Sequence, residues 1–317
     1  PDRHLHLVLE NEENQASWLR RDAAGWPMFY SAQWNDDVHH GLHTAATGET
    51  AGYYQDYAGD IRKLARSLAE GFTFQGEIMH YRGHVRGEPS AGLPPTAFVS
   101  FIQNHDQIGN RAFGERLDKL APDEAVRAIA AVYILAPQVP MIFMGEEWGA
   151  AQPFLFFCDF GPDLASVVQE GRRAEFARFP EFRDPEEASR IPDPCAGETF
   201  AASKLAWEDA REGLHTRRLE LYRRLLAVRR REIIPRLANL AGGSGRYEVL
   251  AHAAMRVTWK MADESILILC ANLGSDPLVL ADALQGSLIW VEGKLRDSTF
   301  DPWTVAWFID DSDHDVR

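Results

Sequence analysis

The stretch AFVSFIQNHD, residues 97–106, decides the fold class of this 317-residue chain. Its first six residues are apolar except for Ser100, and such a short apolar run predicts a buried β-strand. The four residues that follow are all polar, so the strand ends abruptly. Strands of a parallel barrel are buried and apolar, and their C-terminal ends carry the active site. The stretch therefore predicts a parallel β/α fold with functional side chains directly after this strand.

Two other apolar runs end in the same way. Residues 7–9 (LVL) lead into Glu10, and residues 142–144 (IFM) are followed by Gly145 and then by Glu146. Carboxylates placed after separate parallel strands would converge at one edge of the sheet. Glycoside hydrolysis requires such an arrangement, with an acid and a second carboxylate flanking the bond that breaks. Each carboxylate alone has a simpler explanation, which is to cap the next helix, so spacing leaves the reaction class open.

Helical patterns alternate with the apolar runs over the first two thirds of the chain, which indicates βα units. Periodic apolar residues predict helices over residues 37–47, 60–71, 123–135 and 214–231. A weaker strand is expected at residues 28–32, whereas residues 76–95 and 152–202 are expected to form long irregular segments. From Pro235 onward, five short strand candidates separated by turns predict an all-β module, of the antiparallel sandwich type.

The composition excludes several classes of protein. A formal net charge of −14 argues against partners such as nucleic acids or anionic membranes, which need a basic surface. No apolar run is long enough to span a bilayer, and no signal-peptide pattern is present. Cys158, Cys195 and Cys270 lack metal-ligand spacing and are expected to be buried free thiols, which favours a cytoplasmic protein. Because His39 and His40 are adjacent in an expected helix and point in different directions, we expect no metal.

The polar strand ends resemble those of the α-amylase superfamily, glycoside hydrolase family 13. FVSFIQNHD, residues 98–106, is similar to the motif after barrel strand seven, and LVLEN, residues 7–11, is similar to the motif after strand five. Three further strings resemble in particular the maltooligosyltrehalose trehalohydrolases of that superfamily. They are QNHDQIGNR, AQWNDDVHH and MGEEW, at residues 103–111, 32–40 and 144–148. The resemblance covers nearly the whole chain.

The resemblance implies an α/β fold made of half a barrel and a second domain. Residues 1–234 would form the second half of a (β/α)8 TIM barrel, strands five to eight, and residues 235–317 a small C-terminal antiparallel β-sandwich domain. The nucleophilic Asp of the family follows strand four in a string similar to G-F-R-x-D, and no such string occurs here. Since the sequence begins at Pro1, close to its first strand, we expect an upstream half to be missing. The chain alone should then be inactive. Because its strand edges would be open, it should be poorly soluble or should associate with that half.

The resemblance also assigns roles to individual residues. Glu10 would be the general acid/base, Asp106 would stabilise the transition state, and His105 and Asn104 would hold the same sugar ring. Further candidates for substrate binding are Gln107, Arg111, Trp34, Asp36, His39 and Glu146. Arg111 has an equal alternative, which is a scaffold ion pair with a carboxylate. No cofactor is expected.

The implied activity is that of a retaining glycoside hydrolase. It would release trehalose from maltooligosyltrehalose by cleaving the α-1,4 bond next to the trehalose unit. One alternative is an α-glucan branching or debranching enzyme of the same superfamily. Another is a glucan-binding protein without catalysis, because the nucleophile is absent from the chain. The expected partners are maltooligosyltrehalose or another α-glucan as substrate, and the missing N-terminal half.

Overall fold

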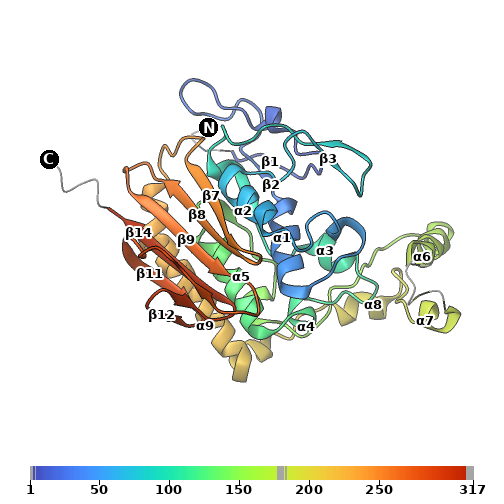
Figure 1. Ribbon diagram of the computed structural model, residues 1–317. Helices are drawn as coiled ribbons and strands as arrows, with labels where there is room; N and C mark the ends of the chain where they lie inside the picture. The colour runs from blue at the N-terminus through green and yellow to red at the C-terminus, as the bar shows by residue number, and fades with distance from the viewer. Residues whose placement is uncertain (1–2, 4, 177–181, 183, 312–317) are drawn as a thin grey trace. The chain divides into compact units, whose positions relative to one another are not determined.

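The computed structural model describes residues 3, 5–176, 182 and 184–311 (Figure 1). The chain packs into two compact units. Unit 1 combines residues 1–102, 121–141 and 221–317, and unit 2 combines residues 103–120 and 142–220. Unit 1 is therefore assembled from three separate stretches of sequence.

A parallel sheet of four strands lies in unit 1. The strands β1 (Val8–Leu9), β2 (Ala32–Trp34), β5 (Phe98–Ser100) and β6 (Val139–Pro140) follow one another in that order, and each neighbouring pair is parallel. All three residues of β5 are buried, as the apolar run predicts. The structure thus confirms a parallel β/α arrangement around residues 97–102, although the strands are shorter than the apolar runs.

The prediction of a strand at residues 28–32 is wrong for its first four residues, because β2 begins only at Ala32. The backbone at residues 28 and 30 bonds to a preceding loop, whereas the Ser31 amide donates to the carbonyl of Leu7 directly before β1 (2.7 Å). Arg21 donates from Nη1 to the carbonyl of Tyr30 (3.2 Å) and from Nη2 to that of Ser31 (2.6 Å), and the Met28 amide bonds to the Arg20 carbonyl. Contacts with residues 18–21 therefore hold most of this segment in place of strand pairing.

Helices α1 (Asp36–Thr47), α2 (Ile61–Glu70) and α5 (Asp123–Leu135) lie where the periodicity predicts them. The Asp60 side chain caps α2 by accepting a hydrogen bond from the Arg62 amide (3.2 Å), which satisfies one free donor at the helix start. Helix α5 is buried along most of its length, and this explains its almost continuous apolar sequence.

The Gly- and Pro-rich segment 76–95 contains an antiparallel hairpin where only a loop was expected. Strands β3 (Glu77–Met79) and β4 (His84–Arg86) pair with Ile78 opposite Val85. Both of these side chains are exposed, so the hairpin carries little of the apolar alternation that marks a strand in a sequence.

The C-terminal stretch forms the five expected antiparallel strands and three that were not expected, over residues 295–296, 299–300 and 304–310, and together they make two sheets within unit 1. The larger sheet has the order β11-β14-β9-β8-β7 and consists of β7 (Gly245–Ala251), β8 (Ala254–Lys260), β9 (Ile266–Asn272), β11 (Ser287–Glu292) and β14 (Thr304–Asp310). The smaller sheet has the order β10-β13-β12 and consists of β10 (Leu278–Val279), β12 (Leu295–Arg296) and β13 (Thr299–Phe300). An apolar cluster joins them: Ile268, Cys270, Leu280, Phe300, Ala306 and Phe308.

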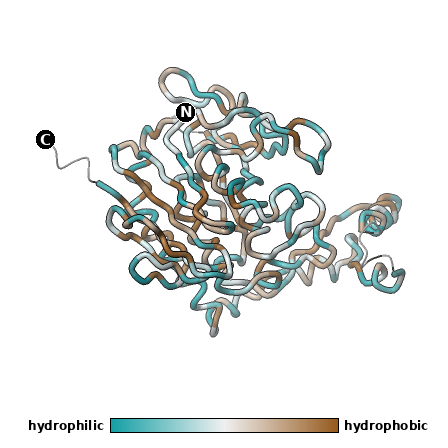
Figure 2. Tube along the Cα trace, in the orientation of Figure 1, coloured by the Kyte–Doolittle hydropathy of each residue, from teal (hydrophilic) through white to brown (hydrophobic). Residues whose placement is uncertain are grey.

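The other face of the larger sheet is covered by α2 and α5 of the same unit. The Trp307 indole on β14 donates to the carbonyl of Ala131 in α5 (3.0 Å), and its ring stacks on Trp259 with centroids 5.7 Å apart. Figure 2 shows the central strands of this sheet and α5 as predominantly hydrophobic. Since both faces are covered, β9 and β14 are buried over nearly their full lengths.

Unit 2 is built from short helices. These are α3 (His105–Gly109), α4 (Leu117–Leu120), η4 (Glu146–Trp148), α6 (Pro162–Phe176), α7 (Pro185–Ser189), α8 (Gly197–Ala202) and η6 (Trp207–Arg211), and α9 (Gly213–Val228) begins here. The prediction that residues 152–202 form an irregular segment was therefore wrong at α6, α7 and α8. Only Arg172 and Phe176 of α6 are buried, so this helix lacks an apolar stripe that a sequence pattern could reveal.

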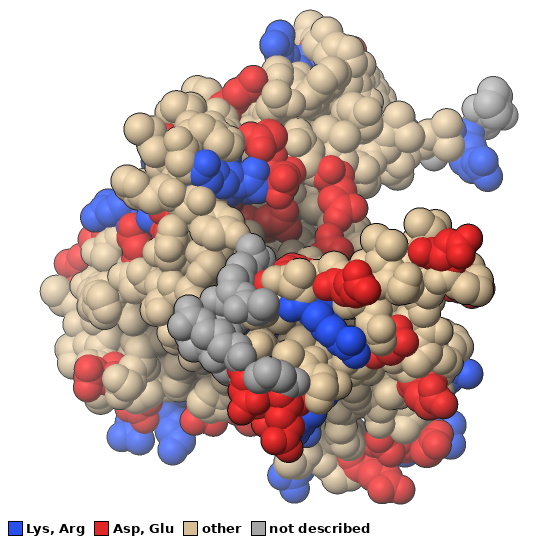
Figure 3. Space-filling model, turned by 90° about the vertical axis from the view of Figure 1, so that its right-hand side faces the viewer, with Lys and Arg blue, Asp and Glu red and all other residues tan. Residues whose placement is uncertain are grey.

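Charges of both signs are distributed over the surface. On the face drawn in Figure 3, acidic side chains are spread widely and basic ones lie between them. This distribution agrees with a formal net charge of −14. Among the described residues, no helix combines the length and the hydrophobicity that a membrane crossing requires.

Candidate active site

Glu10 lies directly after β1, and its side chain is exposed. β2 ends at Trp34, and Asp36 begins α1 two residues later. Because β1, β2 and β5 are parallel, their carboxyl ends lie at one edge of the sheet. This edge of unit 1 presents the first of the predicted carboxylates.

The loop that carries Glu10 is held by buried polar groups. Gln33 of β2 donates through Nε2 to the carbonyl of Asn11 (2.8 Å) and to Oδ1 of Asn14 (3.2 Å). Arg86 donates through Nε to the carbonyl of Glu12 (2.7 Å). Two backbone carbonyls and one side chain after Glu10 are thereby held by side chains from β2 and β4.

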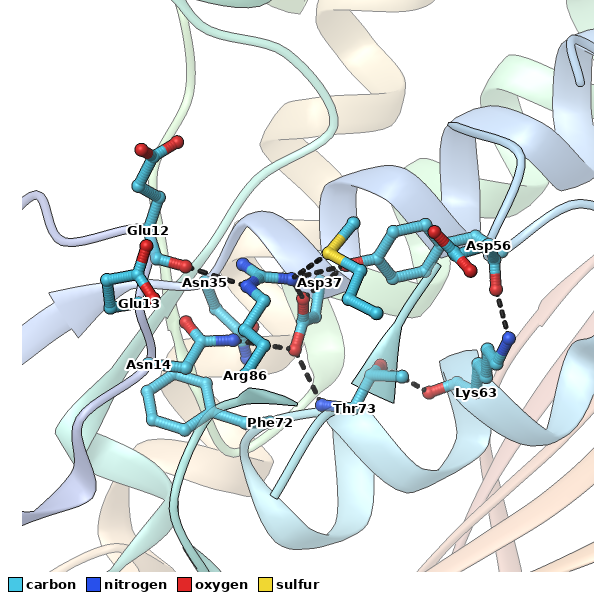
Figure 4. Close-up of polar contacts among 12 residues, drawn as sticks. Glu12, Glu13, Asn14, Asn35, Asp37, Asp56, Lys63, Phe72, Thr73 and Arg86 are labelled. Carbon is cyan, nitrogen blue, oxygen red and sulfur yellow. Dashed lines mark hydrogen bonds and ion pairs between the residues drawn. The ribbon is translucent and has the colours of Figure 1, made fainter. Parts of the chain in front are cut away.

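Arg86 also anchors this loop to α1 through Asp37, as Figure 4 shows. The Arg86 guanidinium donates from Nη1 to Asp37 Oδ1 (2.8 Å), and Asp37 Oδ2 accepts from the Asn14 side chain (3.0 Å). The Tyr57 hydroxyl also donates to Asp37 Oδ1 (2.6 Å), and the Thr73 amide donates to Oδ2 (2.6 Å). The sequence singled out Asp36, whereas Asp37 next to it holds the scaffold together.

His39 lies inside unit 1 and not at its surface. Its Nδ1–H donates to the carbonyl of Ile102 (2.7 Å), and Nε2 lies 3.2 Å from the Tyr54 hydroxyl. Burial, with a smaller contribution from the neighbouring His43, lowers the pKa of His39 to about 3. The neutral ring thus supports the backbone that leaves β5, and both of its nitrogens bond within the chain.

Trp34, a further candidate for sugar binding, is half-buried. Its ring meets Phe101 edge to face, with centroids 5.9 Å apart. The contact fixes the orientation of the indole beside the strand end.

The four residues from Asn104 to Gln107 form the start of α3 in unit 2. Asn104 is the N-cap, and its Oδ1 accepts hydrogen bonds from the amides of Asp106 (2.9 Å) and Gln107 (3.2 Å). The Asn104 side chain is buried. Asparagine is a favoured N-cap residue, so its position in the NHD string also explains why a helix starts there.

His105 and Asp106 are brought together by α3. His105 Nε2 lies 3.4 Å from Asp106 Oδ1, and 49% of each side chain is exposed. An imidazole and a carboxylate presented side by side offer hydrogen-bond donors and acceptors suited to hydroxyl groups. Of the predicted site residues in unit 2, this pair has the clearest access to a ligand.

Arg111 follows α3 and pairs with Glu115, with Nε 3.3 Å from Oε2. This is the scaffold contact that the sequence left open beside sugar binding. The segment is held from α6 as well, where Arg172 donates through Nη2 to the carbonyls of Gly109 (2.6 Å) and Arg111 (2.9 Å). Sequence reasoning missed Arg172, because its partners lie about 60 residues away along the chain.

Glu146 is 1% exposed and lies in the short helix η4. Gly145 precedes it in the left-handed region (φ 85°). Nearby, the buried Arg116 donates to the carbonyls of Met144 (2.9 Å) and Gln152 (2.6 Å). Burial lowers the pKa of Arg116, and the charge of Glu146 opposes that shift. In this structure, Glu146 is part of the interior of unit 2.

The chain is similar to curated proteins along most of its length. It is 40% identical over 310 residues to a malto-oligosyltrehalose trehalohydrolase of Brevibacterium helvolum, a match that covers 95% of this chain and 50% of the relative. It is 34% identical over 300 residues to a protein of the same name from Mycobacterium tuberculosis, which covers 94% of this chain and 50% of the relative. No protein-family model matches the chain.

Solved structures agree with these relatives. A Salmonella typhimurium crystal structure assigned to the alpha amylases is 40% identical and has a TM-score of 0.90, with 98% of this chain and 52% of that chain covered. The alpha-amylase from H. orenii is 15% identical and has a TM-score of 0.51, so it supports the fold alone. The chain spans about half the length of the curated relatives named above.

Proposed function

The chain belongs to the family of the malto-oligosyltrehalose trehalohydrolases, and on that premise we propose that it carries the acid/base carboxylate of a retaining trehalohydrolase. The reaction is cleavage of the α-1,4 bond next to the trehalose unit of maltooligosyltrehalose. One observation carries the proposal: Glu10 directly follows β1, and Asn104, His105 and Asp106 follow the parallel strand β5.

Glu10 is proposed as the general acid/base. As an acid it protonates the glycosidic oxygen of the leaving glucan, and as a base it later removes a proton from the attacking water. Its loop is suited to this work, because Gln33 and Arg86 fix the backbone behind it while the carboxyl stays exposed. A catalytic carboxyl needs such a fixed backbone, since an error of about 1 Å in its position can lower the rate by roughly 100-fold.

Asp106 is proposed to stabilise the positive charge that develops on the sugar ring. A carboxylate is the appropriate group, because the transition state resembles an oxocarbenium ion. His105, beside it, would donate to a hydroxyl of the same ring. The Asn104 cap supports both by fixing the first turn of α3.

The nucleophile of a retaining mechanism is proposed to come from sequence outside this chain. The four parallel strands of unit 1 would then be half of a (β/α)8 barrel, and β1 would pair with a strand of the other half. Leu5, Leu7 and Val8 support this, because they are exposed large apolar side chains on or next to an edge strand.

The proposal is tested by joining this chain, in one reading frame, to the half of the Brevibacterium helvolum relative that it does not match. Trehalose release from maltooligosyltrehalose is measured for the chain alone and for the fusion. We expect release only from the fusion, because covalent catalysis needs the nucleophile. In the fusion, Glu10→Gln should lower kcat/KM by about 100- to 10,000-fold, the range for losing a general acid.

Glu12→Gln is the matched control. Glu12 lies two residues beyond Glu10, and its exposed side chain pairs with Arg82. It should leave kcat/KM within about threefold of the parent fusion, since an exposed ion pair contributes little. A fusion that transfers glucan to form branches, or that cuts α-1,6 bonds, would support the branching or debranching alternative. A fusion that binds glucan without cleaving it would overturn the catalytic proposal.

A further inference from the structure

Two segments of unit 2 run beside each other in a fixed register near α8. The amide of Cys158 donates to the carbonyl of Pro194 (2.9 Å), and the amide of Leu155 donates to Oγ of Ser203 (3.0 Å). Between these bonds, the rings of Phe157 and Phe200 meet edge to face with centroids 5.2 Å apart. Three contacts thus keep the segment that ends at Cys158 aligned with the residues around α8.

The register places two cysteines side by side. Sγ of Cys158 lies 3.6 Å from Sγ of Cys195, and both side chains are half-buried. The Cys195 backbone is fixed as well, because its amide donates to Oδ1 of Asp193 (2.9 Å). The expectation that these two thiols are fully buried was wrong, whereas Cys270 on β9 is buried. Cys158 and Cys195 are therefore open to a small reagent in a way that Cys270 is not.

We propose that Cys158 and Cys195 are a thiol–disulfide modification site that reacts with a small disulfide such as glutathione disulfide. One cysteine thiolate attacks a sulfur of the reagent, forms a mixed disulfide and releases one glutathione thiolate. The second cysteine loses its proton and attacks the protein sulfur of that mixed disulfide, which releases the second glutathione. The two protein thiols are oxidised by two electrons, the reagent is reduced, and both protons end on glutathione.

The second step is favoured by the geometry. A disulfide bond is about 2.05 Å long, so the two sulfur atoms need to approach by roughly 1.5 Å, a movement that side-chain rotation can provide. Because the partner thiol is already in contact, the internal attack should outcompete a second molecule of reagent.

The local environment sets the pH at which the first step proceeds. Burial, together with Cys195 and the charges of Asp193 and Asp159, raises the pKa of the Cys158 thiol to about 11. Only the thiolate reacts, so the modification should be slow near neutral pH and faster in alkaline buffer.

The product would tie the two ends of a long segment together. Residues between Cys158 and Cys195 include α6 and α7, and the buried Arg172 of α6 bonds to the end of α3. The cross-link is thus a covalent connection across the part of unit 2 that supports α3.

The test is to incubate the chain with glutathione disulfide at pH 8.5 and to record its intact mass and its peptide map without reduction. The expected product has lost the mass of two hydrogen atoms and contains one peptide pair joined through Cys158 and Cys195. Dithiothreitol should restore the starting mass. The variant Cys270→Ser should behave as the parent does, because Cys270 lies apart in the β-sheet core.

Single variants separate the internal disulfide from simple glutathione addition. Cys158→Ser and Cys195→Ser should each stop at one mixed disulfide, with the mass of one glutathione added. The proposal is overturned if the parent chain carries two glutathiones instead of an internal bond. It is also overturned if Cys158 and Cys195 stay reduced when the same reagent modifies a free thiol peptide in the same tube.

Discussion

Arg86 Nη1 lies 2.8 Å from Asp37 Oδ1, and both side chains are almost completely buried, at 2% and 0% exposed. The pair joins the β3–β4 hairpin to α1, and through Glu12 and Asn14 it reaches the loop that carries Glu10. Asp37 pairs with Arg86 and accepts three further hydrogen bonds, so its charge is compensated in the interior.

Replacing Asp37 should therefore destabilise the chain strongly. Asp37→Asn leaves the buried Arg86 charge without its partner, which typically costs about 3–5 kcal/mol. Urea denaturation followed by circular dichroism measures the loss. Glu187→Gln is the control, because its ion pair with Arg190 is exposed and should contribute about 1 kcal/mol or less. A loss of similar size in both variants would contradict the role given to Asp37.

The buried His39 should make stability fall in acid. Its pKa is about 3 in the folded chain, whereas an unfolded histidine has a pKa near 6.5, so only the unfolded state takes up a proton between these values. The contribution is fully present above pH 6.5 and should decrease by about 1.4 kcal/mol for each pH unit below it. His39→Gln should remove this slope, so the parent's advantage over the variant should shrink by about 2 kcal/mol from pH 7 to pH 5. An advantage that is equal at both pH values would argue against a neutral buried His39.

Gly71 cannot accept a side chain at the end of α2. Its φ is +99°, and a Cβ there would lie 2.1 Å from Cζ of the buried Phe98 on β5. Gly71→Ala should cost about 2–5 kcal/mol, from overpacking and from the left-handed backbone. Gly83→Ala, where φ is +72° and no atom lies within 4 Å, should cost only about 1–2 kcal/mol. Thermal melts of the two variants would distinguish the steric clash from backbone strain, and equal losses would exclude the clash.

Trp307 should contribute strongly to the stability of unit 1. Trp307→Phe removes the hydrogen bond to the Ala131 carbonyl and leaves a smaller ring in a fully buried site, at a cost of about 1–3 kcal/mol. Trp207→Phe, at an exposed position, should change stability by about 0.5 kcal/mol. The shift in the urea midpoint measures both. If Trp307→Phe were as mild as Trp207→Phe, the packing of α5 against β14 would contribute little.

Much of the fold could be predicted where burial follows a regular period. Helix α5 has the predicted bounds, because Pro122 and Asp123 mark its start and its residues after Arg127 are all apolar. The C-terminal strands β7, β8 and β9 were found from short apolar runs between turns. Helix α6 was missed because nearly all of it is exposed, and the β3–β4 hairpin because the paired Ile78 and Val85 face solvent.

In the proposed site, only the exposed residues could be predicted from the sequence. Glu10, His105 and Asp106 stand directly after apolar runs, and the structure keeps them exposed. Their support comes from Arg86 and Arg172, whose partners lie far away in the sequence. An arginine carries no local signal of such partners, because burial and hydrogen bonding are decided by the tertiary packing.

Strand β14, which begins at Thr304, pairs with β9 on one side and β11 on the other, and through Trp307 it touches α5. During synthesis, the ribosome makes this strand after all the other described strands of unit 1. Until then, β9 has an open edge and α5 lacks the surface that covers it, so the nascent chain exposes apolar segments that can aggregate. Unit 1 would therefore be complete only after β14 has been made, and chaperones would be needed most in the interval before that.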